Sequence, residues 1–226
     1  MKEIIVIAEH RRGELRDVTW EMLSKGRQLA ESTSAELGVA LLGKGMNPLA
    51  EALKPKAKRV LLIEDPRLEA FNAETYKKVL TQLITERKPS LTLIGHSAMG
   101  MDFAPRLAAH LKMPLATDCI GIEVKDETFS LTRQIYGGKV NAEVSFLKKG
   151  PYIITVRPGA FAVVEKDPLA GEIVSLPSPL TDEGLARRFL EYVEAAAGEV
   201  DITQADILVS VGRGIKEVAN IPIVKE

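Results

Sequence analysis

The chain has 226 residues, 46% of them hydrophobic and 27% charged, so it can bury a core and is not a disordered protein. Its formal net charge of −1 argues against a nucleic-acid partner, because nucleic-acid binders normally have a basic surplus. Cys119 is the only cysteine, which excludes a disulfide framework and predicts a reducing, cytoplasmic location. No apolar stretch approaches the ~20 residues that cross a bilayer, so we expect no membrane insertion.

Short apolar runs alternate with amphipathic segments through the first half of the chain. The runs predict buried strands, and the segments predict helices because their apolar residues recur at helical spacing. Asn72 is the expected N-cap of one helix, and Pro105 is expected in the first turn of another. This order predicts an α/β fold with a doubly wound, mostly parallel sheet. The predicted strands are 4–8, 36–42, 60–63 and 91–94, and the predicted helices are 17–31, 47–53, 73–84 and 102–111.

The pattern changes after residue 128. Apolar and polar residues alternate on both sides of Gly137-Gly138, which predicts a β-hairpin over 129–146. A second turn at 148–150 leads into the apolar run 152–156. We therefore expect a small antiparallel β-meander to be added to the parallel sheet.

Prolines punctuate residues 167–180 and predict a domain boundary near 178. The expected domains are an amino-terminal α/β domain, 1–178, and the beginning of a second α/β domain, 179–226. In the second, Thr181 is the expected cap of a helix, and the apolar run 207–211 predicts a buried parallel strand.

Few residues suggest catalysis. No histidine has the spacing of a metal site. His96 and Ser97 follow the predicted strand 91–94, at the sheet edge where α/β proteins bind ligands. The sequence favours an ordinary loop histidine bonded to the backbone at His96, and GHSAMG around Ser97 lacks the spacing of a nucleophile elbow. Residues 43–45, Gly-Lys-Gly, follow another strand but lack the phosphate-binding P-loop pattern.

The turn Gly212-Arg213-Gly214 is a further candidate site. Glycines let a ligand approach the backbone closely, and arginine supplies a fixed positive charge with planar donors. These properties suit a flavin ring or a phosphate. The turn by itself fits a cofactor loop and a purely structural turn.

Five stretches, taken in order, resemble the α subunit of electron transfer flavoproteins. The first is an apolar strand followed by AEH, a glycine turn and a helix ending in GRQLA. The others include an A-P-R-L-A helix, a hairpin with Y-G-G, a T-V-R strand and the G-R-G turn. The stretches are VIAEHRRGELRDVTWEMLSKGRQLA (6–30), APRLAAHL (104–111), TRQIYGGKVNAEV (132–144), TVRPGAF (155–161) and ILVSVGRGI (207–215).

The resemblance implies an electron carrier rather than an enzyme. Such α subunits pair with a β subunit, and the heterodimer takes electrons from flavin dehydrogenases, notably acyl-CoA dehydrogenases of fatty acid β-oxidation, to an acceptor. The first α domain docks the β subunit, and FAD lies mainly in the second. The family's flavin-facing G-R-G corresponds to Gly212, Arg213 and Gly214.

Two departures from the family pattern concern the FAD site. Val211 stands where the family more often has glycine, and segments resembling the family's Q-x-G-Q-T-G loop and G-I-S-G-A-x-Q-H helix start are absent. We therefore expect a complete first domain, only the opening of the FAD domain, and no stoichiometric retention of FAD by this chain alone.

Two alternatives remain open from the sequence. A stand-alone adenine-nucleotide-binding module would use the sheet edge at 8–10 and 95–100. A hydrolase would use Ser97 or His96.

Overall fold

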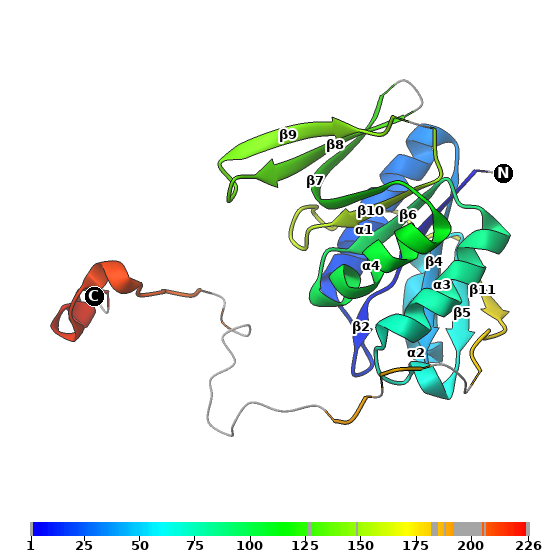
Figure 1. Cartoon of the computed structure of the whole chain (residues 1–226), viewed down its shortest axis with the longest axis horizontal. Coiled ribbons are helices and arrows are strands. Elements are labelled where there is room, and N and C mark those ends of the chain that lie inside the picture. Colours follow the sequence, from blue (N-terminus) through cyan, green and yellow to red (C-terminus); the bar gives the residue numbers. More distant parts are fainter. Residues whose placement is uncertain are drawn as a thin grey trace. The chain divides into compact units, whose positions relative to one another are not determined.

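A computed structural model describes residues 2–125, 128–147, 149–181, 185–187, 189–191, 205 and 207–224. The chain divides into two compact units, Met1–Phe189 and Leu190–Glu226, which are described separately (Figure 1). The boundary expected near 178 stays a prediction.

The first unit is built on a nine-stranded sheet of the described residues, in the order β11-β5-β4-β1-β6-β10-β7-β8-β9. Every neighbouring pair from β11 to β7 is parallel, whereas β8 and β9 join antiparallel. The predicted mostly parallel α/β sheet is thus confirmed. The strands are β1 (Glu3–Ile7), β4 (Glu36–Gly43), β5 (Arg59–Glu64), β6 (Leu91–Gly95), β7 (Leu115–Lys125), β8 (Thr128–Ile135), β9 (Val140–Ser145), β10 (Tyr152–Val156) and β11 (Glu172–Leu176).

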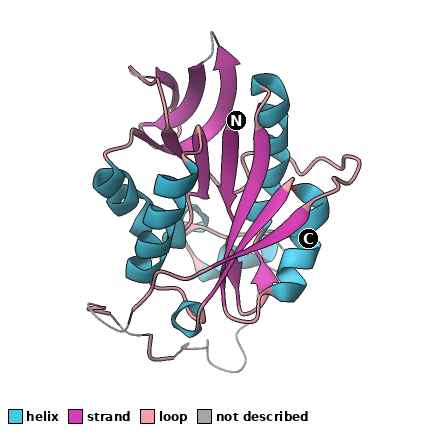
Figure 2. Ribbon diagram, turned by 90° about the vertical axis from the view of Figure 1, so that its right-hand side faces the viewer, coloured by secondary structure: helices cyan, strands magenta, loops and turns pink. Residues whose placement is uncertain are grey.

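Helices cover both faces of this sheet, as Figure 2 shows. Alternate residues of β1 point to opposite faces, so Ile4 and Val6 join one buried cluster and Ile5 and Ile7 join the other. Helices α1 (Asp17–Thr33) and α2 (Asn47–Leu53) contribute to the first cluster, and α3 (Ala73–Arg87) and α4 (Ala98–Leu111) to the second. A short antiparallel pair, β2 (His10–Arg11) and β3 (Glu14–Leu15), precedes α1.

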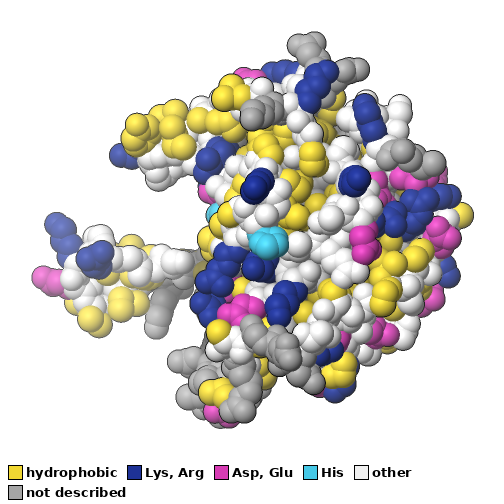
Figure 3. Space-filling view, turned by 45° about the vertical axis from the view of Figure 1, so that its right-hand side comes forward, with side chains coloured by type: hydrophobic (Ala, Val, Ile, Leu, Met, Phe, Trp, Pro, Cys, Tyr) yellow, Lys and Arg dark blue, Asp and Glu magenta, His cyan; other side chains and the backbone are white. Residues whose placement is uncertain are grey.

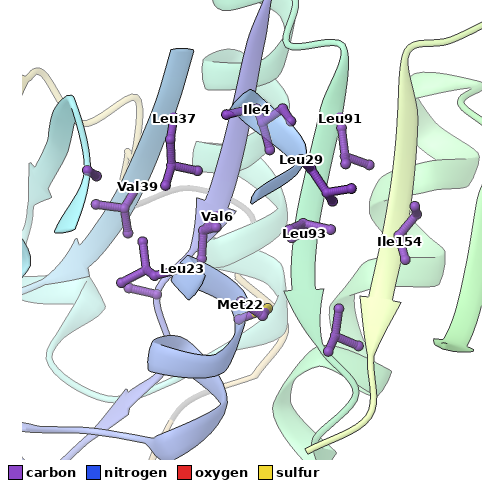
Figure 4. Close-up of a cluster of buried hydrophobic side chains, with 14 of the residues drawn as sticks. Ile4, Val6, Met22, Leu23, Leu29, Leu37, Val39, Leu91, Leu93 and Ile154 are labelled. Atoms are coloured by element: carbon purple, nitrogen blue, oxygen red, sulfur yellow. The ribbon is translucent and has the colours of Figure 1, made fainter. Parts of the chain in front are cut away.

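Helix α1 packs its apolar stripe across the middle of the sheet (Figure 4). Met22, Leu23 and Leu29 come from α1 and are each at most 3% exposed. Their partners come from β1, β4, β6 and β10, which makes α1 the element that covers most of one face. Burying side chains of this size stabilises the fold by about 1.5–3 kcal/mol each.

The start of α4 differs from the prediction. The helix begins at Ala98, where the Ser97 hydroxyl accepts a hydrogen bond from the Gly100 N–H at 3.2 Å. Pro105 therefore lies inside the helix rather than in its first turn, and the prediction for it is wrong. Its exposed position explains the tolerance, because the ring and the missing N–H lie on the solvent side. The predicted N-cap Asn72 is confirmed by its 2.8 Å bond from the Glu74 N–H.

The meander is a second correction. β8 and β9 form the predicted hairpin, but the run 152–156 is the parallel strand β10 between β6 and β7. All five of its residues are buried, which is the pattern of a central parallel strand rather than of an exposed hairpin.

The strand β11 was not predicted, because it lies within the proline-rich segment. It pairs with β5 along the sheet edge, where flanking prolines are tolerated. The residue before β11 is Gly171, and the close approach of its backbone requires a glycine. A Cβ there would lie 2.2 Å from the carbonyl oxygen of Lys54 and 2.3 Å from that of Ala57.

The second unit lacks the predicted strand. Residues 207–211 are not in a strand, and Ile207, Leu208 and Val209 are 84%, 54% and 69% exposed. An apolar run becomes a buried strand only beside a partner, and the described residues of 190–226 supply none. They instead form 3₁₀ turns at Arg213–Ile215 and Val218–Val224. The helix predicted after Thr181 lies largely outside the described residues.

We predict that Gly100→Ala destabilises the protein. A Cβ at Gly100 would lie 1.8 Å from the carbonyl oxygen of Gly95, so α4 would have to move away from β6. Urea unfolding should show a loss of about 2 kcal/mol from overpacking. Helix propensity alone would change stability in the opposite direction, by about 1 kcal/mol.

Ala109→Gly is the matched control, because Ala109 is exposed on the same helix. It should lose only the propensity difference of about 1 kcal/mol. A Gly100→Ala protein as stable as the parent would show that the close approach of α4 to β6 is wrong.

Candidate functional site

The carboxyl ends of β1, β6 and β10 meet at one edge of the sheet, where open α/β sheets bind ligands. Glu9, His96 and Arg157 follow these three strands within two residues. Asp118 of β7 joins them, because the parallel pairing of β7 with β10 is irregular between Ile154 and Val156. The sequence singled out His96 and its neighbour Ser97 and placed residues 8–10, which include Glu9, at the same edge, but it did not single out Asp118 or Arg157.

An ion pair between Asp118 and Arg157 forms the centre of this edge. The guanidinium donates to both carboxylate oxygens, at 2.8 Å from Nε to Oδ1 and 2.6 Å from Nη2 to Oδ2. It also donates to the side-chain oxygen of Gln134 on β8. The hydrogen bonds from Arg157 hold the pKa of Asp118 below its ordinary value. The pair thus links the end of β10 to β7 and β8.

Both ring nitrogens of His96 face the same group of residues, and its Nε2 lies 3.9 Å from Asp118 Oδ1. Its Nδ1 lies 2.9 Å from the hydroxyl oxygen of Thr155, which also accepts a 2.9 Å bond from the Asp118 N–H. Its backbone N–H donates to the Val156 carbonyl at 2.6 Å. His96 therefore has the structural role of a bonded loop residue.

Ser97 has a different partner from His96. Its hydroxyl donates to the Glu9 carboxylate at 2.6 Å and caps α4. In the Ser-His-Asp arrangement the serine hydroxyl is bonded to a histidine, whereas this hydroxyl is bonded to Glu9 and to the Gly100 N–H, and His96 is bonded elsewhere. The geometry thus gives no support to the hydrolase alternative.

The same contact bears on the nucleotide alternative. The amino terminus of a helix attracts phosphate through its free N–H groups and dipole. The amino terminus of α4 already faces the Glu9 carboxylate, which accepts the hydrogen bond from the Ser97 hydroxyl. Glu9 is also close to the end of β6, since a Cβ at Gly95 would lie 3.0 Å from Glu9 Oε2. A phosphate would meet a like charge there, so the start of α4 is a poor phosphate site.

The β8–β9 ribbon extends from the sheet away from the helices (Figure 1). Its turn takes left-handed backbone angles at Tyr136, Gly137 and Gly138, with φ of 53°, 64° and 85°. Tyr136 is 77% exposed and Val140 46% exposed, and Figure 3 shows hydrophobic side chains on the projecting part. Exposed apolar side chains on a protruding ribbon are typical of a protein-binding surface.

The predicted flavin contact, Gly212-Arg213-Gly214, is solvent-exposed in the second unit. Arg213 begins a 3₁₀ turn closed by the 3.1 Å bond from the Ile215 N–H to the Gly212 carbonyl. A Cβ at Gly212 or Gly214 would meet nothing within 4 Å, so the backbone is open to an approaching group. The role of these three residues stays a prediction.

Comparison with known proteins agrees with the resemblance seen in the sequence. The family described as "Electron transfer flavoprotein domain" matches residues 4–180. The chain belongs to the electron transfer flavoprotein family. The family prediction is therefore confirmed.

Individual relatives cover most of this chain. The "Electron transfer flavoprotein subunit alpha" of Megasphaera elsdenii is 38% identical over 95% of this chain and 64% of its own length. The protein of that name in Bacillus subtilis (strain 168) is 37% identical over 95% of this chain and 65% of its own length. The "Acryloyl-CoA reductase electron transfer subunit beta" of Anaerotignum propionicum is 30% identical over 96% of this chain and 66% of its own length. The chain thus spans slightly less than two thirds of these relatives, whose names describe electron-transferring subunits.

Two residues of the site, Arg157 and Asp118, were not predicted from the sequence. Arg157 could have been found, because it directly follows a buried strand and lies in the stretch that resembles the family's T-V-R. Its partner Asp118 lies in a strand that was not predicted.

Among the described helices, none is both long and apolar enough to cross a membrane.

We predict that Asp118→Asn lowers stability at pH 7 and that the difference disappears in acid. The pKa of Asp118 is depressed by folding, so its stabilising contribution is complete above the unfolded-state pKa of about 4 and is lost as pH falls through the folded-state pKa. Thermal unfolding at pH 7 should show a melting temperature about 2–4 °C lower.

Glu143→Gln is the control, because Glu143 pairs with Lys125 on the exposed ribbon surface, where solvent screens the charges. It should leave the melting temperature unchanged. An equal deficit of Asp118→Asn at acid and neutral pH would contradict the stabilising ion pair.

Proposed function

We propose that this chain is the α subunit of an electron transfer flavoprotein, or the amino-terminal part of one. It would act in a heterodimer with a β subunit, carrying electrons from flavin dehydrogenases such as acyl-CoA dehydrogenases to an acceptor. The supporting observation is the similarity of almost the whole chain to proteins named electron transfer flavoprotein α subunits. We further propose a role in fatty acid β-oxidation and a cytoplasmic location, the latter because Cys119 is buried and free.

The first unit would dock the β subunit, and the β8–β9 ribbon is our candidate surface. Ile135, Tyr136 and Val140 place exposed apolar groups around the turn. Gln134, the residue before them, is bonded to Arg157, so the ribbon is anchored to the centre of the sheet rather than hinged freely. An aromatic side chain presented on an anchored element is a frequent source of binding energy at interfaces.

FAD would supply the redox centre, since a flavin can accept and release electrons. Arg213 would place a cation against the ring, with Gly212 and Gly214 leaving room for it. The described residues of 190–226 otherwise form no enclosing walls, because residues 207–214 are all exposed. They fit one contact to a flavin, and we propose that the remaining contacts require residues outside those described.

We predict that Tyr136→Asp weakens the complex with the β subunit at least tenfold. The substitution places a charge in the apolar surface that the partner would cover, and losing one such anchor is worth 1.4 kcal/mol or more. Isothermal titration of the chain with the β subunit from the same organism would measure the affinity.

Met101→Asp is the matched control, because Met101 is 50% exposed on α4. It should bind as tightly as the parent. Equal affinities for the parent and Tyr136→Asp would exclude the ribbon from the interface, whereas no binding by the parent chain would contradict the proposed heterodimer itself.

A further inference from the structure

Residues 157–171 form a strap that runs from the end of β10 along the outside of α1 to β11. Four side chains of α1 hold it, and their spacing of three to four residues places them on one side of the helix. Both carboxylate oxygens of Glu21 accept from the Gly159 N–H, at 3.0 and 2.9 Å, and the Ser24 hydroxyl accepts from the Val164 N–H at 3.1 Å. Arg27 Nη1 donates to the Asp167 carbonyl at 2.7 Å, and Glu31 pairs with Lys166 at 2.6 Å.

The strap does not lie flat on the helix. A cavity of about 260 Å³ remains between them, lined by α1, by Lys56 and by residues 163–166. Its apolar walls come from Trp20 and Leu23 on the helix and from Val163 and Val164 on the strap. The two valines are 52% and 56% exposed, which is a large apolar exposure for a segment that hydrogen bonds hold in place.

The charges around the cavity have an excess of one positive. Arg27 and Lys166 share Glu31, at 3.3 and 2.6 Å, so one carboxylate partly neutralises two cations. Glu165 adds a second negative charge. Lys56 is partly buried, and its ammonium makes no ion pair or hydrogen bond with the residues that the structure describes. One cation beside an apolar cavity is therefore available to a ligand.

We propose that this cavity binds a small amphipathic carboxylate. The apolar part would lie between Trp20, Leu23 and the two strap valines, and the carboxylate would pair with Lys56. A single excess positive charge matches a monoanion better than a doubly charged phosphate. The volume is just below the 300–1,000 Å³ typical of small-molecule sites, which limits the ligand to a short acyl chain or one aromatic ring. The residues of this site are not among those proposed for the heterodimer surface or the flavin contact.

Trp20 makes the proposal directly measurable, because it is the only tryptophan in the chain. Titration of the whole protein with octanoate should change the Trp20 emission saturably, with a dissociation constant of about 1 mM for a ligand of this size. Neutral 1-octanol should bind at least fivefold more weakly, since it lacks the charge that pairs with Lys56. Equal binding of the two, or an emission change that does not saturate, would overturn the proposal.

Two variants test the residues involved. Lys56→Gln should weaken octanoate binding about fivefold and leave octanol binding unchanged, whereas Lys58→Gln, an exposed control two residues away, should alter neither. Val164→Asp places a carboxylate in the apolar wall and should abolish the octanoate response, and its exposed position keeps the fold intact, which circular dichroism would verify. Identical octanoate affinity in Lys56→Gln and Lys58→Gln, or a normal response in Val164→Asp, would refute the site.

Discussion

The parallel pairing of β10 between β6 and β7 is the interaction on which the rest of the first unit depends. Five consecutive buried residues pair with Leu91–Gly95 on one side and with the start of β7 on the other. The strand closes the core beneath α1 and brings Thr155 and Arg157 to the sheet edge beside Asp118. Its far end begins the strap that crosses α1 and ends in β11. The ion pair at the sheet edge and the start of the strap both follow from the position of this one strand.

Sequence reasoning succeeded where a short pattern has one physical solution. The helix at 47–53 and the Asn72 cap are as predicted, because periodicity and a capping side chain are local properties. The sequence did not predict a strand's place in the sheet where that place depends on residues far away along the chain. The run 152–156 has the same apolar pattern in a meander and in a central strand, and only its neighbours distinguish the two. β7 escaped detection because its strand pairing is irregular around residues 118–121, which breaks the apolar alternation, and β11 because prolines flank it.

The candidate site shows the same division. His96 and Ser97 were placed at the correct edge, since strand ends can be located from sequence. The hydrogen bonds that these two residues make could not be predicted, because their partners Thr155 and Glu9 lie 59 and 88 residues away along the chain. Those partners change the interpretation from possible catalysis to structural bonding. The edge is occupied by the protein's own charges, which agrees with a docking scaffold better than with a nucleotide-binding pocket.

We propose that this chain supplies the docking scaffold and only one of the contacts that hold the flavin. The most direct test of this proposal is the flavin content of the purified chain after saturation with FAD and gel filtration, measured by absorbance against protein concentration. We expect far less than one flavin per chain. A yellow protein that retains one flavin per chain would contradict it, and loss of that flavin in Arg213→Ala would show that the described turn, with its neighbours, forms a complete site.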